Sequence, residues 1–195
     1  DGEWVVLADD QAVVRDGLSR FAGRDLSLDD EVFESATATN HRNRAIARLL
    51  EAVGGLNADP EETVELYTRL CSLSVTATDL ALMAASLADG GVNPVSRERV
   101  VDQASCRHTL AVMASAGLYE TSGDWLYEVG LPGKSGIGGG IVTVSPGKGG
   151  LGTFAPLLDR AGNSVKGCRA ATCLAQRLGL DLFASEPDAP PPPTR

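Results

Sequence analysis

The segment of this sequence with the clearest chemical potential is a glycine-rich run, residues 130–141, in which Lys134 and Ser135 stand side by side. A lysine and a hydroxyl among glycines can bind an anion, because glycine lets a ligand approach the backbone closely. A phosphate-binding P-loop is nevertheless rejected. That motif needs a further glycine five positions before Gly133, where Glu128 stands, and it needs a helix directly after the lysine, where this sequence continues as a glycine-rich strand.

Two interpretations of Lys134-Ser135-Gly136 stay open from these residues alone. The triplet fits the Lys-[Ser/Thr]-Gly element on an inner-edge strand of serine β-lactamases and transpeptidases. There the lysine supplies positive charge, the hydroxyl binds substrate and the glycines let substrate lie along the backbone. The triplet also fits a tight turn that leads into a twisted edge strand, and a match of three residues favours that structural role.

A second short pattern, Ser145-Pro146-Gly147-Lys148, has the S-x-x-K form of a serine nucleophile with a lysine base. It falls on a Pro-Gly turn between two expected strands, whereas a working pair needs both side chains on one face of a helix. We therefore interpret these residues as a turn and not as a nucleophile.

Hydrophobic spacing predicts the elements that must position these residues. After a short apolar run at 4–7 and a mixed acidic segment up to residue 30, we expect helices over 39–53, 60–71, 78–88 and 101–116, and a last one after Ser164. Between the last two helices, 125–129, 140–144 and 151–155 are expected as short strands joined by hairpins. Helices, then strands, then a terminal helix predict an α+β domain.

Composition and charge exclude several classes of protein. The 195 residues are 43% hydrophobic and 22% charged, as in a folded domain, and the net charge of −9 argues against nucleic acid or an anionic membrane as partner. No apolar run is long enough for a membrane-spanning helix. Four dispersed cysteines and two histidines give neither a zinc pattern nor a disulfide framework, so we expect no metal and reduced, mostly buried thiols in a cytoplasmic protein.

The two ends of the chain favour a piece of a longer protein. The only methionines are Met83 and Met113, and no signal peptide opens the chain. Residues 183–195 are rich in Pro, Asp, Ala and Ser, and we expect an extended linker there that leads to a possible further domain.

Four blocks, kept in order and spacing over nearly the whole chain, resemble the serine-dependent glutaminase family. They are TNHRNRAIA at 39–47; YTRLCSLSV at 67–75 with DLA at 79–81 and LADGGVNP at 87–94; GLYETSG at 117–123 followed by VGLPGKSGI at 129–137; and PLLD at 156–159 with GNSVKG at 162–167. The resemblance implies a β-lactamase/transpeptidase-like fold, of which residues 1–182 would be the C-terminal part.

The resemblance also implies a reaction, the hydrolysis of L-glutamine to L-glutamate and ammonia without a metal or organic cofactor. Its serine nucleophile lies in an S-x-x-K motif that precedes everything present here. Tyr67 and Tyr119 would line the glutamine pocket, with Tyr119 also acting in proton transfer, although each tyrosine taken alone favours a half-buried packing role. Asn43 would hold substrate polar groups, and the N–H of Ile137 would contribute to the oxyanion hole. Supporting roles fall to Lys134, Ser135 and Gly136.

One departure from the family pattern concerns substrate affinity. The family has a substrate-binding glutamate seven residues before the asparagine, and Ala36 occupies that position here. Glu34 could replace the missing carboxylate only through a local shift of the backbone. Ala36 therefore favours an alternative function, that of a catalytically degenerate, glutaminase-like binding or regulatory module. A penicillin-recognising enzyme is a third possibility, and the resemblance implies a homodimer or homotetramer.

Overall fold

The computed structural model describes residues 11–185, so the apolar run at 4–7 and most of the expected linker lie outside the described residues. In chain order the described elements are α1 (Gln11–Ala22), α2 (Asp30–Thr39), α3 (His41–Ala52), α4 (Pro60–Cys71), α5 (Ala77–Ala88), α6 (Gln103–Ala116), the 3₁₀ turn η1 (Tyr119–Thr121), α7 (Ser122–Val129), β1 (Gly133–Ser135), β2 (Gly140–Ser145), β3 (Gly149–Phe154) and α8 (Val165–Leu178).

The helices begin where the sequence supplies capping groups. Asp59 accepts hydrogen bonds from the first backbone N–H groups of α4, and Pro60 occupies the first turn, where its missing N–H costs nothing. Thr76 and Asp79 form a reciprocal capping box at the start of α5. Ser164 caps α8 by accepting from the N–H of Gly167. The boundaries predicted for these helices are confirmed because local capping decides them.

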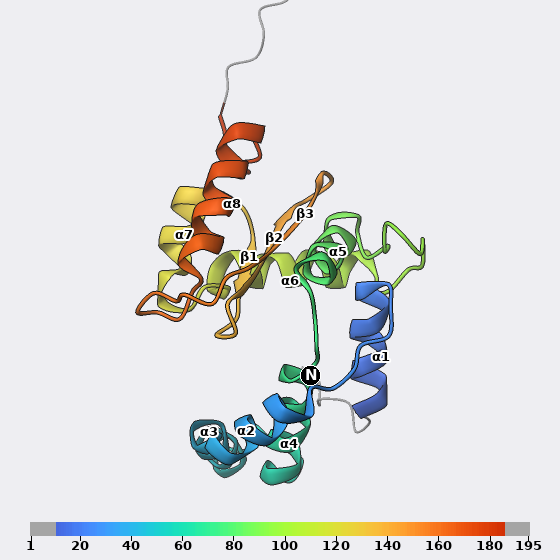
Figure 1. The fold of residues 1–195 in the computed structure, drawn as a ribbon, viewed down its shortest axis with the longest axis vertical. Coiled ribbons are helices and arrows are strands. Elements are labelled where there is room, and N and C mark those ends of the chain that lie inside the picture. Colours follow the sequence, from blue (N-terminus) through green and yellow to red (C-terminus); the bar gives the residue numbers. More distant parts are fainter. Residues whose placement is uncertain (1–10, 186–195) are drawn as a thin grey trace, which may run out of the picture.

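Three antiparallel strands in the order β1-β2-β3 form a sheet with helices on both faces. Figure 1 shows α7 and α8 on one side of the sheet and α5 on the other. Side chains of β2 alternate between the two faces: Ile141 packs with the apolar residues of α7 and α8, and Val144 packs with those of α5 and α6. The central strand therefore joins two hydrophobic clusters into one layered body.

Helix α5 lies unusually close to β3, and two glycines of that strand make the approach possible. A Cβ added at Gly150 would lie 2.3 Å from the Cβ of Ala84, and one added at Gly152 would lie 2.3 Å from the carbonyl oxygen of Ala77. Contacts this short do not occur between real side chains and backbone. The small residues of α5 and the glycines of β3 thus fix the distance between helix and sheet.

We expect Gly152→Ala to lower the free energy of unfolding by about 2–3 kcal/mol, because the new methyl group would force α5 away from the sheet. Urea unfolding followed by circular dichroism measures the change. Gly149→Ala is the matched control in the same strand, since no atom lies within 4 Å of a Cβ placed there. Equal stability losses in the two variants would contradict the close-packing explanation.

A second group of helices, α2, α3 and α4, packs together apart from the sheet (Figure 1). Two extended segments side by side connect it to the rest: the N–H of Ser74 donates to the carbonyl of Ser27 at 2.8 Å, and the N–H of Asp29 donates to that of Ser72 at 2.9 Å. Beside these bonds, Arg24 makes a two-pronged ion pair with Asp79, with Nε–Oδ1 at 2.9 Å and Nη2–Oδ2 at 2.7 Å.

The Asp79 carboxylate joins three parts of the chain at the start of α5. It is 4% exposed, pairs with Arg24 and accepts the N–H of Thr76 at 2.7 Å. The guanidinium of Arg24 and the hydrogen bonds of Thr76 outweigh the effect of burial and lower the pKa of Asp79 to about 2. Its charge thus stabilises the junction between α1, the segment before α5, and α5 itself.

We expect Asp79→Asn to reduce the free energy of unfolding by about 2 kcal/mol at pH 6. Because the folded-state pKa of Asp79 lies below its ordinary value, the contribution is complete above about pH 4 and is lost as the pH falls toward 2. Urea unfolding between pH 3 and 6 should therefore show the wild type and the variant converging in acid. The control is Asp16→Asn, which changes an exposed carboxylate on α1. A difference in unfolding free energy between the wild type and Asp79→Asn that does not change with pH would contradict the role given to the Asp79 charge.

One sequence prediction is wrong, and two helices were not predicted. Residues 125–129 lie in α7 and not in a strand, because Trp125 and Val129 are buried on one helical face while Tyr127 is 92% exposed. The acidic segment before residue 30 contains α1, which weak apolar spacing concealed. Helix α2, over Asp30–Thr39, was likewise not predicted, whereas the helix predicted over 39–53 is confirmed as α3.

The strand and turn predictions around β2 are confirmed. Strands β2 and β3 fall where the alternating residues placed them, and 145–148 forms the turn between them. In that turn the N–H of Lys148 donates to the carbonyl of Ser145 at 3.0 Å, and Gly147 has a φ of 71°. The Lys148 ammonium reaches the carbonyl of Gly179 and not the Ser145 hydroxyl. The literal S-x-x-K is therefore a structural turn.

Candidate active site

Lys134 and Ser135 lie on β1, an edge strand of the described sheet, and Gly136 follows it directly; the strand is bonded to the segment before Tyr119 through the Ser135 N–H and the carbonyl of Gly117. The Lys134 ammonium lies 5.0 Å from the centre of the Tyr119 ring, an arrangement that favours a cation–π contact, and it donates a hydrogen bond to the carbonyl of Ser135. Desolvation lowers the pKa of Lys134, while nearby Cys71 acts in the opposite direction. A positive charge is thus held at the face of an aromatic ring.

Tyr119 adopts a backbone conformation that L-residues rarely take, with a φ of 54°. The turn around it is held by three hydrogen bonds: the Leu118 N–H donates to the Ser122 hydroxyl, that hydroxyl donates to the Tyr119 carbonyl, and the Thr121 N–H donates to the Leu118 carbonyl. Leu118 is 1% exposed and anchors the turn in the core. Such strain costs about 1–3 kcal/mol and gathers at functional sites.

The loop after β1 presents the N–H of Ile137 to solvent. The loop is closed by bonds from Gly136 to the carbonyl of Gly140 at 3.0 Å and from Gly139 to the carbonyl of Gly136 at 2.9 Å. Ile137 between them is 77% exposed, and its N–H makes no hydrogen bond to any of residues 11–185. A free backbone donor at a fixed position is the element from which oxyanion holes are built.

Gly162 brings Ile137 and Tyr119 together. A Cβ added at Gly162 would lie 3.5 Å from Cγ2 of Ile137 and 3.6 Å from Cε2 of Tyr119. The loop that follows β3 therefore touches both residues. Lys134, Tyr119 and Ile137, which the sequence places on three different segments, form one cluster.

Helix α4 contributes Tyr67 and Cys71, one helical turn apart, to the same region. A hydrogen bond with the Cys71 side chain, repulsion from the negative charge that a deprotonated Cys71 or Tyr119 would carry, and burial together raise the pKa of Tyr67 to about 12. The Tyr67 hydroxyl is thus protonated at neutral pH. Because Cys71 also acts on Lys134, this part of α4 faces the Lys134–Tyr119 pair.

Asn43 is linked to α4 by a chain of side-chain hydrogen bonds. Its amide donates to Oδ1 of Asn40 at 2.5 Å, and the amide of Asn40 donates to the hydroxyl of Thr68 at 2.6 Å. Thr68 is buried beside Tyr67 and itself donates to the carbonyl of Val64. Helices α3 and α4 are thereby locked in register, with Asn43 at the free end of the chain of bonds.

The surroundings of Ser135 and Ala36 bear on the roles predicted for the supporting residues and for the departure from the family pattern. Ser135 is 2% exposed, its hydroxyl has no partner within residues 11–185, and its role stays a prediction, as does that of Gly136. Ala36 lies on α2, so Glu34, two residues earlier, is rotated by about 200° around the helix. Glu34 therefore points away from the side that Ala36 occupies, and a small backbone shift does not interchange the two.

Sequence reasoning missed the contacts of Cys71, Gly162 and the loop around Gly162. The block GNSVKG marked this loop without giving it a role, and the spacing of four residues between Tyr67 and Cys71 was the available signal for that pair. The expectation of mostly buried thiols is wrong: Cys106 is buried, Cys168 is half-buried, and Cys71 and Cys173 are exposed. Exposure is decided by which helix face meets the core, which the cysteine count does not reveal.

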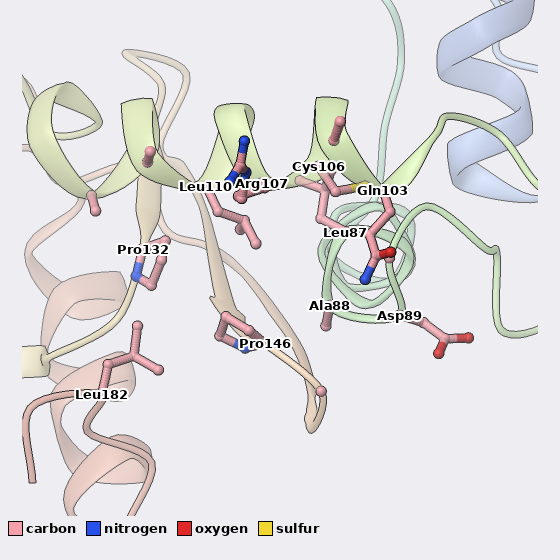
Figure 2. Close-up of a pocket in the computed structure, with 15 residues that line it drawn as sticks. Leu87, Ala88, Asp89, Gln103, Cys106, Arg107, Leu110, Pro132, Pro146 and Leu182 are labelled. Atoms are coloured by element: carbon pink, nitrogen blue, oxygen red, sulfur yellow. The ribbon is translucent and has the colours of Figure 1, made fainter.

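A separate hollow of about 960 Å³ lies between the end of α5, α6, the β2–β3 turn and the chain after α8. Figure 2 shows Leu110 and Arg107 of α6 on one side of it, with Pro132, Pro146 and Leu182 opposite. Neither tyrosine of the cluster lines it, nor does Lys134 or Ile137. The hollow is thus distinct from the candidate active site.

Within residues 11–185, no three His, Cys, Asp or Glu side chains are grouped so that they could hold a metal ion. Over the same residues, no helix combines the length and apolar character needed to cross a bilayer.

A model of the glutaminase family matches residues 7–183 of this chain. The chain belongs to the glutaminase family. Glutaminase 2 of Yersinia pestis is 67% identical over 174 residues, 89% of this chain and 51% of that protein. The glutaminase of Brucella canis is 53% identical over 165 residues, 85% of this chain and 52% of that protein. The chain therefore spans about half the length of the curated relatives it matches.

Solved glutaminase structures share the fold of this family member. The structure of probable glutaminase ybaS has a TM-score of 0.89 at 42% identity and matches 92% of this chain and 60% of that one. The Bacillus subtilis glutaminase YbgJ, solved as a covalent complex with 5-oxo-L-norleucine, has a TM-score of 0.84 at 34% identity and matches 87% of this chain and 61% of that one. The predicted α+β, β-lactamase-like fold is confirmed.

Proposed function

We propose that this chain forms the substrate-binding and oxyanion-stabilising part of a glutaminase that hydrolyses L-glutamine to L-glutamate and ammonia. The observation that carries the proposal is the unbonded N–H of Ile137 beside Tyr119 and Lys134. Further support comes from the Bacillus subtilis relative, whose covalent complex was formed by reaction with 6-diazo-5-oxo-L-norleucine.

Each residue of the cluster has a chemical role in this reaction. As a nucleophile attacks the side-chain amide, the carbonyl oxygen gains negative charge, which the Ile137 N–H stabilises by a hydrogen bond. Tyr119 exchanges a proton with the attacking or leaving group, and the Lys134 ammonium lies over its ring. Tyr67, protonated at neutral pH, donates a hydrogen bond to the substrate, and Asn43 holds its polar groups.

The nucleophile in this proposal is a serine of an S-x-x-K motif outside the 195 residues. The S-x-x-K within them is a β-turn, and its Ser145 is 5% exposed. A weak hydroxyl nucleophile needs an adjacent base, and no such pair is formed there. A cytoplasmic location, predicted from the cysteines, and a homodimeric or homotetrameric assembly, implied by the family resemblance, stay predictions.

Ala36 favours a second candidate function, a glutaminase-like module that has lost activity. The family resemblance places a substrate-binding carboxylate at this position, and an alanine cannot pair with the α-amino group of glutamine. Losing a hydrogen bond to a charged group costs about 2 kcal/mol of binding free energy, which corresponds to about a thirtyfold loss of affinity.

The first test uses a chimera in which this chain replaces the matching half of Yersinia pestis glutaminase 2. We expect the 195-residue chain alone to release no ammonia from glutamine and the chimera to release it. In the chimera, Tyr119→Phe should lower kcat about 10²- to 10³-fold through loss of proton transfer. Tyr127→Phe, 92% exposed on α7, is the control and should leave kcat unchanged.

Two outcomes would overturn this proposal. A folded chimera that binds glutamine but never hydrolyses it would support the degenerate module instead. Ammonia release by the isolated chain, abolished by Ser145→Ala, would place the nucleophile inside the 195 residues.

The second test restores the missing carboxylate. We expect Ala36→Glu in the chimera to lower KM about tenfold or more with little change in kcat, since the new group would bind the part of glutamine that does not react. Steady-state ammonia release measures both constants. Glu34→Gln is the control, because Glu34 faces another side of α2. An unchanged KM for Ala36→Glu would show that position 36 lies outside the substrate site.

A further inference from the structure

The loop between β3 and α8 is built around the carboxylate of Asp159. One oxygen, Oδ1, accepts the N–H groups of Ala161, Gly162 and Asn163, each at 2.9 Å. The Asp159 N–H in turn donates to the carbonyl of Asn163 at 2.8 Å. Gly162 has a φ of 100°, a conformation that side-chain-bearing residues rarely adopt. The loop is thus a closed turn whose shape depends on one carboxylate and one glycine.

Asn163 ties this loop to the turn that carries Tyr119. It is 1% exposed, and its amide donates to the hydroxyl of Thr121 at 2.9 Å. That hydroxyl donates to the carbonyl of Leu118, also at 2.9 Å. Thr121 and Leu118 flank Tyr119 in the chain. The buried asparagine therefore bonds directly to the segment that holds Tyr119 at a positive φ.

The same loop lies next to Ile137, whose N–H has no hydrogen-bond partner within residues 11–185. A Cβ placed at Gly162 would be in ordinary van der Waals contact with the ring of Tyr119 and with the side chain of Ile137. Ile137 is mostly exposed, and the hydrogen bonds of its loop are made by Gly136 and Gly139 on either side of it. The Asp159–Asn163 loop thus lies next to both Tyr119 and Ile137.

We propose that Asp159 and Asn163 are positioning residues that fix Tyr119 and Ile137 relative to each other. They act through the loop backbone and Thr121 and do not touch the substrate. Because Tyr119 and Ile137 lie on separate segments that this loop contacts together, small movements of the loop would change the position of one relative to the other. The expected effect on turnover rests on the proposed function, whereas the expected effect on the positions of Tyr119 and Ile137 does not.

The geometric part is tested on the 195-residue chain by hydrogen–deuterium exchange. The N–H groups of Thr121 and Gly139 are hydrogen-bonded reporters of the Tyr119 turn and the Ile137 loop. We expect Asp159→Ala and Asn163→Ala to raise exchange at both reporters about tenfold or more, and Asp159→Asn, which keeps one acceptor oxygen, to raise it less.

Asp102→Ala is the matched control for exchange. Asp102 also accepts a backbone N–H, that of Ser105 at 2.9 Å, but it lies at the far end of α6, about 20 Å from the Tyr119 turn. Its substitution should leave both reporters unchanged. Unchanged exchange at Thr121 and Gly139 in Asp159→Ala and Asn163→Ala would overturn the proposal, as would equal changes in Asp102→Ala.

The catalytic part is tested in the chimera by separating kcat from KM. Asn163→Ala and Thr121→Val each remove the same hydrogen bond, so each should lower kcat about 5- to 20-fold with KM changed less than twofold. The double variant should lose no more than either single variant. A double variant whose loss of kcat equals the product of the two single losses would overturn the positioning role. So would single variants in which KM rises while kcat is unchanged. If the unsubstituted chimera were inactive, the proposed function would fail, and the exchange experiment would still decide the geometric inference.

Discussion

The close packing of α5 on the sheet is the constraint from which the positions of the site residues follow. Gly150 and Gly152 remove the side chains that would separate helix and strand, and the alanines of α5 fill the remaining space. The sheet, so placed, carries Lys134 and the Ile137 loop. The start of α5 carries Asp79, whose ion pair with Arg24 joins the sheet-bearing body to α1 and, through the adjoining extended segments, to helices α2–α4.

The candidate site is assembled from segments that share no secondary-structure element. Tyr67 comes from α4, Tyr119 from a 3₁₀ turn, Ile137 from a loop after β1, and Gly162 from a loop after β3. A site of this kind can hold strain, such as the positive φ of Tyr119, because the surrounding packed elements determine the backbone from several sides. The residues of the site lie where the helices and the sheet come together. The loop that carries Gly162 can therefore lie next to both Tyr119 and Ile137.

Local signals in the sequence were enough for the elements whose boundaries depend on nearby residues. Asp59 before Pro60, Thr76 before Asp79, and Ser164 before α8 fixed three helix starts. Residues 125–129 were misinterpreted because a run of five mostly apolar residues is too short for its spacing to distinguish a strand from a helix. Only the burial of Trp125 with Val129, and the bond from the Trp125 indole to the carbonyl of Leu131, decided in favour of a helix.

The sequence by itself determined the family, the α+β class and the identity of the candidate site residues, because these depend on residue types in a conserved order that needs no coordinates. The tertiary structure alone decided which of those residues meet. Among residues 11–185 the Ile137 N–H has no hydrogen-bond partner, Lys134 lies over the Tyr119 ring, and the loop of Asp159 and Gly162 lies next to Ile137 and Tyr119. Contacts between residues 15 to 52 positions apart are set by the packing of helices on a sheet, and no local pattern encodes that packing.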